Sequence, residues 1–340
     1  MENNFLSLEG SLNLCKTFFN VYYPLRYLAT GSNKKYYLTN NIIKVCRFCN
    51  KKDPEVTFFN NAHTIPKFLG NRDNLSNFEC DNCNKIFSLY EKHLSSYVGI
   101  DKTIAYYLDD KLHRKNPKFE HNDGSLKIKR DKKIIIVDKL AEKEFLIDDE
   151  NNKTLKLKYD IEFIPINVFK SLVKIALCLL NCDEIKLFEV TKNFLLDSSL
   201  NNNYRIKSFS FLLKYFTPNE YFEFPTAYLL KKYSNNKNVC CPEFTMILFH
   251  HQSVFQIFIP LNINDKEIFN ICEEINFPIY PPVMIYPNGE RVYTVFKESQ
   301  YLGYEYLFGD KMIKKEGNEL EIKYKQKYKD IPDNLRMNLE

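Results

Sequence analysis

The chain has 340 residues, of which 44% are hydrophobic, and its 48 basic and 43 acidic side chains give a formal net charge of +5. This length favours two domains over one, and the mild positive charge permits a polyanionic partner without requiring one. The sequence has no run of about 18 apolar residues and begins without a positively charged leader, which excludes a membrane-spanning segment and predicts a soluble cytoplasmic protein.

The N-terminal half predicts a short segment followed by a compact module. The opening residues mix apolar and aromatic side chains with a polar stretch, and we expect them to pack as a cap on the module that starts at Cys46. After Cys83, apolar residues recur at helical spacing, which predicts an amphipathic helix that ends at Gly99. The polar stretch 110–125 is the predicted linker. The predicted division is a cap over 1–45, a module over 46–110 and a C-terminal domain over 125–340.

The C-terminal region predicts a mixed α+β domain. Apolar and alternating patterns indicate strands, and Pro165 is well placed to open an amphipathic helix because proline is tolerated in a first helical turn. The charged segment from Lys311 is expected to be solvated. The predicted elements are strands over 127–137 and 154–164, a helix over 165–180, and two strands between 243 and 260 that join near His250 and His251.

The cysteines point to a metal site. Four of the ten form two C-x-x-C pairs, and four thiolates fill a closed tetrahedral zinc site. A redox role is disfavoured because no thioredoxin-like βαβ pattern surrounds either pair, and the scattered cysteines are interpreted as buried thiols in a reducing compartment. The 30 residues between the pairs exceed the gap of about 15 to 20 found in zinc ribbons, so another element lies between them. The predicted zinc ligands are Cys46, Cys49, Cys80 and Cys83.

Three short motifs lie between and around these pairs. They read Ala62-His63-Thr64-Ile65-Pro66, Leu69-Gly70-Asn71 and Glu79-Cys80-Asp81-Asn82-Cys83-Asn84. Together they resemble the HNH endonuclease family, in its four-cysteine zinc branch with A-H-x-I-P and E-C-x-x-C-N motifs. The resemblance covers about residues 46–98, under a fifth of the chain. It implies an α+β protein with an N-terminal ββα-metal nuclease module, a four-cysteine zinc site, and a larger mixed α+β C-terminal domain.

The resemblance also implies roles for individual residues. His63 matches the general base that takes a proton from the attacking water, and Asn84 matches a ligand of the catalytic cation, Mg²⁺ or Mn²⁺. Asn77 is the better match for the middle asparagine that orients the histidine loop, with Asn74 as a competitor. The implied activity is hydrolysis of DNA phosphodiester bonds.

One position departs from the family pattern. Many HNH nucleases carry an acidic residue or a histidine directly before the catalytic histidine as a further metal ligand, and here that residue is Ala62. The cation would then be held by Asn84, water and phosphate oxygens, with Glu91 or Asp81 as candidate additions. The alternative function is a non-catalytic zinc-stabilised module that binds nucleic acid or protein.

The same resemblance implies partners. Arg47 and Lys67 are the basic residues nearest the nuclease motifs and are candidate nucleic-acid contacts, although basic side chains are more often simply solvated. HNH modules often act in pairs, which suggests a homodimer, and the C-terminal domain is expected to supply recognition or control through a regulatory ligand or protein. Proteins of this arrangement look like bacterial or phage-borne nucleases in antiviral defence. His93, on the predicted helix, is expected to face solvent.

Overall fold

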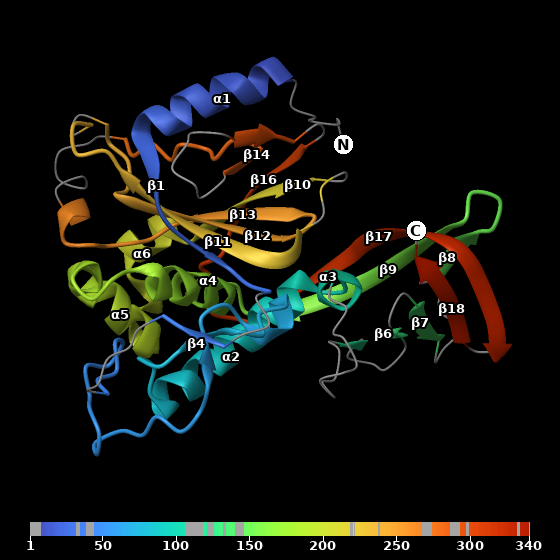
Figure 1. Ribbon diagram of the computed structural model, residues 1–340, viewed down its shortest axis with the longest axis horizontal. Coiled ribbons are helices and arrows are strands. Elements are labelled where there is room, and N and C mark those ends of the chain that lie inside the picture. The colour runs from blue at the N-terminus through green and yellow to red at the C-terminus, as the bar shows by residue number, and fades with distance from the viewer. Residues whose placement is uncertain are drawn as a thin grey trace.

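The computed structural model places helices on both faces of an antiparallel sheet, with a second sheet extending to one side (Figure 1). It describes residues 8–31, 35–38, 44–105, 118–120, 126–131, 134–139, 146–217, 220, 222–236, 239–266, 274–285, 293–296, 299–331 and 334–339. The predicted linker over 110–125 lies mostly outside these residues; within it, Phe119–Glu120 form strand β5.

The helices are α1 (Leu8–Val21), α2 (Asp81–Val98), α3 (Asp101–Ala105), α4 (Pro165–Leu179), α5 (Glu189–Leu196) and α6 (Tyr204–Phe209). Short 3-10 turns are η1 (Lys67–Leu69), η3 (Glu184–Phe188), η4 (Ser198–Asn202) and η5 (Asn264–Lys266).

The strands among the described residues form four sheets. A six-stranded antiparallel sheet has the order β1 (Tyr22–Ala29), β11 (Phe222–Lys232), β12 (Phe244–His251), β13 (Ser253–Phe258), β10 (Phe211–Phe216) and β16 (Gln300–Tyr306). A seven-stranded sheet has the order β5, β6 (Leu126–Asp131), β7 (Ile134–Lys139), β18 (Asn334–Leu339), β17 (Ile313–Ile331), β9 (Thr154–Phe163) and β8 (Leu146–Asp149). The small sheets are β2 (Tyr36–Tyr37), β4 (Asn74–Ser76) and β3 (Ala62–His63), and the pair β14 (Val283–Ile285) and β15 (Tyr293–Val295).

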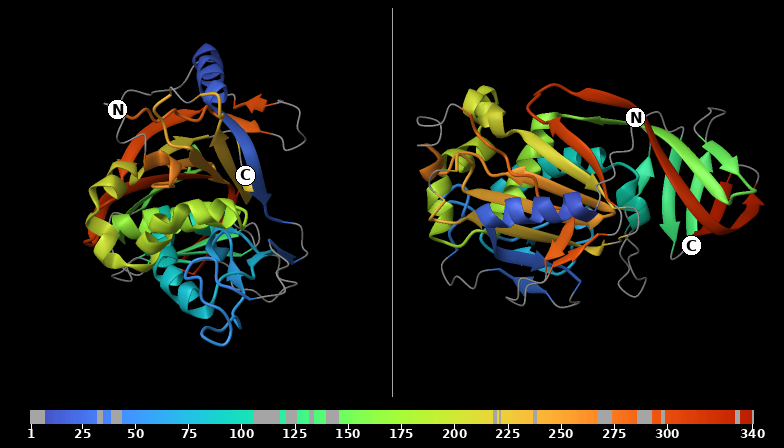
Figure 2. Two further views of the ribbon diagram at one scale, coloured as in Figure 1. Left: turned by 90° about the vertical axis from the view of Figure 1, so that its left-hand side faces the viewer. Right: turned by 90° about the horizontal axis from the view of Figure 1, so that it is seen from above.

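Helix α4 is the centre of the molecule. It lies between the six-stranded sheet, where it contacts β1 and β11, and α2 on its other side (Figures 1 and 2). Pro165 occupies its first turn, as predicted, and almost every later side chain in the helix is buried. A helix that is apolar all round needs partners on every side, and the sheet and α2 provide them. Two lysines, Lys170 and Lys174, are among its buried residues.

The N-terminal segment joins the large sheet. Helix α1 lies over the sheet on the face opposite α4, and β1 is the edge strand that pairs antiparallel with β11 (Figure 1). Phe18 and Tyr22 are fully buried and stack at 5.2 Å. The expected cap is a helix and a strand, but its aromatic side chains pack into the core of the large sheet and not on the module that starts at Cys46.

Two segments after residue 125 differ from the predicted structure. The single strand predicted over 127–137 is two strands, β6 and β7, which pair antiparallel. The charged segment from Lys311 is exposed through Gly317 but regular, since strand β17 pairs with β9 from Ile313 onward. A strand pairing satisfies backbone groups whatever the side chains are, so charge alone did not reveal it. The other predicted strands, β9, β12 and β13, are confirmed.

The segment 62–98 forms a hairpin followed by a helix. Strand β3 pairs antiparallel with β4, and α2 begins directly after the turn that contains Asn77. Gly99 ends α2 as predicted, because its φ of 64° is unfavourable for other residues and a Cβ there would lie 2.9 Å from the Tyr159 ring. The fold class predicted from the sequence is confirmed.

Two side-chain expectations need correction. His93 is half-buried rather than solvated, because its Nδ1 accepts a hydrogen bond of 3.2 Å from the Ile164 backbone N–H at the start of α4. Burial lowers the pKa of His93. Cys240 is disulfide-bonded, so not every cysteine outside the two pairs is a free thiol.

Among the described residues, no helix is both long enough and apolar enough to cross a membrane.

Candidate zinc and nuclease site

The first cysteine pair lies in a tight turn built by backbone hydrogen bonds. The Cys46 N–H donates to the Lys51 carbonyl at 2.7 Å, and the Asn50 N–H donates to the Cys46 carbonyl at 2.9 Å. Asn50 has a φ of 60°, a left-handed conformation that asparagine tolerates better than most residues. The turn folds the chain back so that both thiols face the same side.

The second pair begins helix α2. Cys80 is the N-terminal capping residue of α2 and Cys83 lies in its first turn, so the helix itself sets the spacing of this pair. The Arg47 N–H donates to the Phe78 carbonyl at 2.8 Å and joins the two segments. Phe48 packs against Phe87 with ring centroids 4.7 Å apart, which fixes the first turn on the helix.

All four sulfurs gather at one point. The Sγ atoms of Cys46, Cys49, Cys80 and Cys83 lie within 4.8 Å of one another. Cys46 and Cys83 are 3.7 Å apart, and Cys49 and Cys80 are 3.8 Å apart. Tetrahedral zinc with Zn–S bonds of about 2.3 Å requires sulfurs roughly 3.8 Å apart. The cluster therefore has the dimensions of a zinc site.

The electrostatics of the cluster also fit a cation. The hydrogen bond with the Cys83 thiol lowers the pKa of Cys46 to about 5 against the opposing effect of burial. Burial raises the pKa of Cys80 to about 11, and the same bond with Cys46 raises the pKa of Cys83. One thiolate forms readily and opposes ionisation of its neighbours. A divalent ion would offset that repulsion and let all four bind as thiolates.

Strand β3, which pairs with β4, carries His63. His63 is half-buried and pairs with Leu75 of β4, whereas Ala62 is fully enclosed and pairs with Ser76. Successive side chains of a strand point to opposite faces, so the small Ala62 faces the interior and His63 faces outward.

The loop between β3 and β4 is organised by Asn71. This side chain is fully buried, and its Nδ2 donates to the carbonyls of Ile65 at 2.7 Å and Asn74 at 2.9 Å. Its Oδ1 accepts from the N–H groups of Asp73 and Asn74. Asn71 thus bonds both sides of the histidine loop, whereas the motif comparison favoured Asn77, with Asn74 as a competitor, for orienting this loop. The Leu69-Gly70-Asn71 motif carried the signal, but the spacing gave no reason to prefer its asparagine.

The other predicted residues lie near the start of α2. Asn77 is half-buried in the turn before the helix, and Asn74 is buried with its Nδ2 donating to the Ala29 carbonyl at 2.7 Å. Asn84 is half-buried in the first turn of α2. Asp81, a candidate addition to the cation site, accepts bonds from Thr57 and from the N–H groups of Phe59 and Asn60, and these bonds lower its pKa. Asp81 therefore closes the 57–60 loop, and Glu91, the other candidate addition, lies 3.5 Å from the Lys174 ammonium.

A lysine from α4 reaches into this region. The buried Lys174 Nζ donates to the His63 carbonyl at 2.5 Å and lies 3.3 Å from Glu79 and 3.5 Å from Glu91. Burial by itself would lower the pKa of Lys174, but Glu79, Cys178 and Glu91 raise it. Burial raises the pKa of Glu79 to about 7 despite the lysine. Sequence reasoning missed Lys174, although a lysine in an otherwise apolar helix was a signal for a buried partner.

Arg47 has a different role from the predicted nucleic-acid contact. It is only 8% exposed, and its Nη1 donates to the Leu180 carbonyl at 2.8 Å and the Cys178 carbonyl at 3.3 Å, at the C-terminal end of α4. Its guanidinium also lies 3.6 Å from the centre of the Phe78 ring. A guanidinium there satisfies carbonyls that have no partner within the helix, so Arg47 joins the cysteine turn to α4 instead of reaching a phosphate. Lys67 is exposed on η1.

Comparisons with known proteins agree with this geometry over one segment. The family model described as HNH endonuclease matches residues 46–94, which include both cysteine pairs, β3, β4 and most of α2. The chain therefore carries an HNH endonuclease family domain, and the resemblance found in its motifs is confirmed. No curated protein and no solved structure matches the chain. HNH domains are in general those of nucleases that use divalent metals.

Proposed function

We propose that this protein is a metal-dependent HNH endonuclease that hydrolyses DNA phosphodiester bonds. The observation that carries the proposal is the four-sulfur cluster, which ties the start of α2 to the turn beside the β3–β4 hairpin inside the segment that matches the family. In this arrangement one structural ion would hold the cysteine turn against the first turn of α2, next in sequence to the hairpin that carries His63. Four thiolates would fill the coordination sphere of the zinc and leave no position for substrate. The zinc would therefore be structural, and its binding would contribute to the free energy of folding.

The chemistry is assigned to residues of the hairpin and the helix. His63 acts as the general base that takes a proton from the attacking water, and its half-buried position on β3 leaves it reachable from solvent. Asn84, with Glu91 on the same helix, would hold Mg²⁺ or Mn²⁺, which supplies charge stabilisation for the phosphate and the leaving oxygen. Asn71 and Lys174 hold the histidine strand. Asn77, in the turn before α2, is proposed to help orient the histidine loop.

The remaining parts of the chain are assigned by extension. We propose that residues 46–110 form the nuclease module, that residues 1–45, expected as its cap, link it to the large sheet through β1 and β2, and that residues 125–340 supply recognition or control. Lys67 is the proposed contact to the DNA backbone. Action as a homodimer, response to a regulatory ligand or protein, a cytoplasmic location and a role in antiviral defence belong to the same proposal.

The test uses the full chain with zinc bound, plasmid DNA, and Mg²⁺ or Mn²⁺. We expect nicking or linearisation that depends on the added cation, and a loss of about 10² to 10⁴ in rate for His63→Ala, the usual contribution of a general base. Asn84→Ala should raise the cation concentration needed. Asn82→Ala, an exposed neighbour on the same helical turn, is the matched control and should cleave normally. The proposal fails if DNA stays intact with either cation and His63→Ala is indistinguishable from the wild type.

A second function is favoured by Ala62 alone. This side chain offers no ligand atom at a position where many HNH nucleases have one, so the same scaffold would serve as a zinc-stabilised module that binds nucleic acid or protein without cutting. Metal analysis separates the two functions. The binding module predicts one zinc per chain and DNA retention that is unchanged by Mg²⁺ or Mn²⁺.

A further inference from the structure

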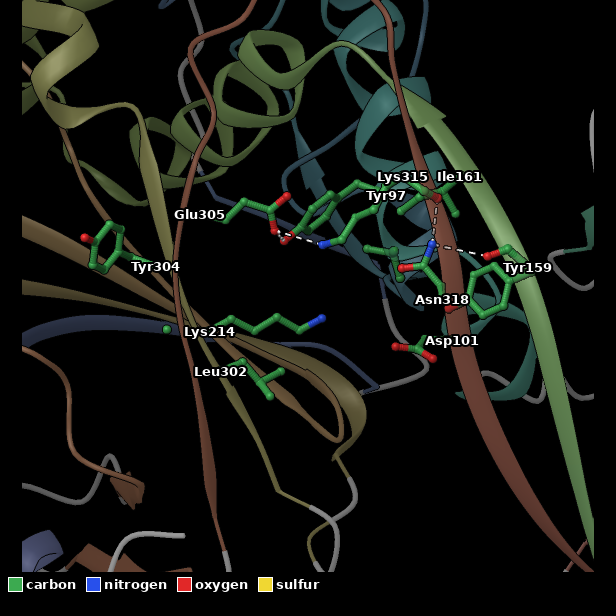
Figure 3. A pocket seen from close by; sticks show the side chains of 12 residues that line it. Tyr97, Asp101, Tyr159, Ile161, Lys214, Leu302, Tyr304, Glu305, Lys315 and Asn318 are labelled. Carbon is green, nitrogen blue, oxygen red and sulfur yellow. Dashed lines mark hydrogen bonds and ion pairs between the residues drawn. The ribbon is translucent and has the colours of Figure 1, made fainter. Parts of the chain in front are cut away.

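A polar cavity of about 360 Å³ lies where the C-terminal end of α2 meets both large sheets. Tyr97 and Val98 of α2 form one wall, Tyr159 of β9 another, and strands β10, β16 and β17 complete it (Figure 3). Its volume falls within the range of small-molecule sites, about 300 to 1,000 Å³. The zinc cluster is at the opposite end of α2, so this cavity is separate from the proposed nuclease site.

Two of the charged groups in the cavity satisfy each other. Glu305 on β16 lies 3.4 Å from the ammonium of Lys315 on β17 and accepts a hydrogen bond of 2.9 Å from the Tyr97 hydroxyl. The Asn318 amide nitrogen donates to the carbonyls of Tyr159 at 3.2 Å and Lys315 at 2.9 Å. Because its nitrogen is used in this way, the Asn318 amide oxygen is left toward the cavity (Figure 3).

Two further charges remain without an ion-pair partner among the described residues. They are the ammonium of Lys214 and the carboxylate of Asp101, which point toward the same space from β10 and α3 (Figure 3). Lys214 makes only longer contacts with aromatic rings, 5.5 Å to Phe255 and 5.9 Å to Tyr97. Burial lowers the pKa of Lys214, although the nearby Asp101 and Glu305 act in the opposite direction.

The charge balance defines the ligand. With Glu305 and Lys315 neutralising each other, one positive and one negative group are left to face a ligand. A plain anion would pair with Lys214 but meet Asp101, and a plain cation would meet Lys214. We propose that the cavity binds a small zwitterion of free amino-acid chemistry, whose carboxylate pairs with Lys214 and whose ammonium pairs with Asp101 and the Asn318 oxygen.

The test is a binding experiment on the full-length zinc-loaded protein, with no cleavage readout. The twenty protein amino acids are screened at millimolar concentration by thermal shift, and the best is titrated by calorimetry. A ligand that binds only the folded state raises the melting temperature. We expect at least one amino acid to do so, and its amide and its N-acetyl derivative each to bind at least tenfold more weakly. Lys214→Met and Asp101→Asn should weaken binding by at least tenfold as well.

Lys186→Met, on the exposed turn η3, is the control and should bind normally. The proposal is overturned if no amino acid shifts the melting temperature, if the two derivatives bind as well as the parent, or if both cavity variants keep full affinity. Inorganic phosphate binding more tightly than every amino acid would instead show a simple anion site and also overturn it. Should Lys214→Met fail to fold, Asp101→Asn and the derivatives decide the outcome.

Discussion

The ammonium of Lys174 donates a hydrogen bond to the main-chain carbonyl of His63 at 2.5 Å, although the two residues are 111 positions apart in the sequence. The same ammonium lies near Glu79, just before the start of α2, and Glu91, in the middle of α2. One side chain from α4 therefore holds strand β3 against the start and the middle of helix α2.

Replacing Lys174 should destabilise the protein. Lys174→Met leaves Glu79, whose side chain is fully buried, without its counter-charge, and breaking a buried pair in this way costs on the order of 3 kcal/mol. Urea unfolding measures this, and adding Glu79→Gln to Lys174→Met should recover part of the loss. If the proposed function holds, cleavage should also fall at least tenfold under conditions where the variant stays folded. A Lys174→Met protein as stable as the wild type would contradict the inferred role.

Replacing Asn71 should destabilise the protein more than replacing Asn77. Asn71→Ala removes four hydrogen bonds within the histidine loop and leaves buried backbone groups unpaired, each at about 1 to 3 kcal/mol. Asn77→Ala, at a half-buried turn position, should cost less. Thermal unfolding of the two variants tests this ranking. A larger loss for Asn77→Ala would return the loop-orienting role to that residue.

Arg47 and Lys67 should differ in kind. Arg47→Met removes a buried guanidinium from the end of α4 and should lower the melting temperature, with no change in how DNA affinity depends on salt among molecules that remain folded. Lys67→Met alters an exposed side chain and, if Lys67 contacts a phosphate, should reduce the salt dependence by about one ion without changing stability. DNA titrations at several salt concentrations distinguish them. Equal salt slopes for wild type and Lys67→Met would remove Lys67 from the interface.

Asp265 should make stability depend on pH. Burial and the nearby Glu243 raise the pKa of Asp265 to about 7, although it accepts a bond from the Glu243 N–H. The folded state thus holds a proton that the unfolded chain releases near pH 4, and this contribution to stability is lost as pH rises from about 4 to 7. Asp265→Asn should flatten that decline, as measured by urea midpoints at pH 5 and pH 8. An unchanged pH profile would show that Asp265 is ionised in the folded protein.

The four-cysteine cluster and the helix α2 could be predicted because they depend on local rules. Two C-x-x-C spacings select tetrahedral thiolate binding, and apolar spacing together with Gly99 sets the extent of α2. Pro165 and the apolar run after it predicted α4 in the same way. The A-H-x-I-P motif marked the HNH segment, since its residues are close in sequence. The motif alone does not determine what each of its residues does.

Contacts made across long sequence separations were decided only by the tertiary structure. Nothing in the sequence pairs Lys174 with His63, places Arg47 on the end of α4, or brings Lys214 and Asp101 to one cavity, because each contact joins elements that propensity and spacing treat independently. Basic side chains read locally as surface or phosphate-binding groups. Their burial depends on which helix or sheet packs over them, and that is fixed when α4 is enclosed between the large sheet and the HNH domain.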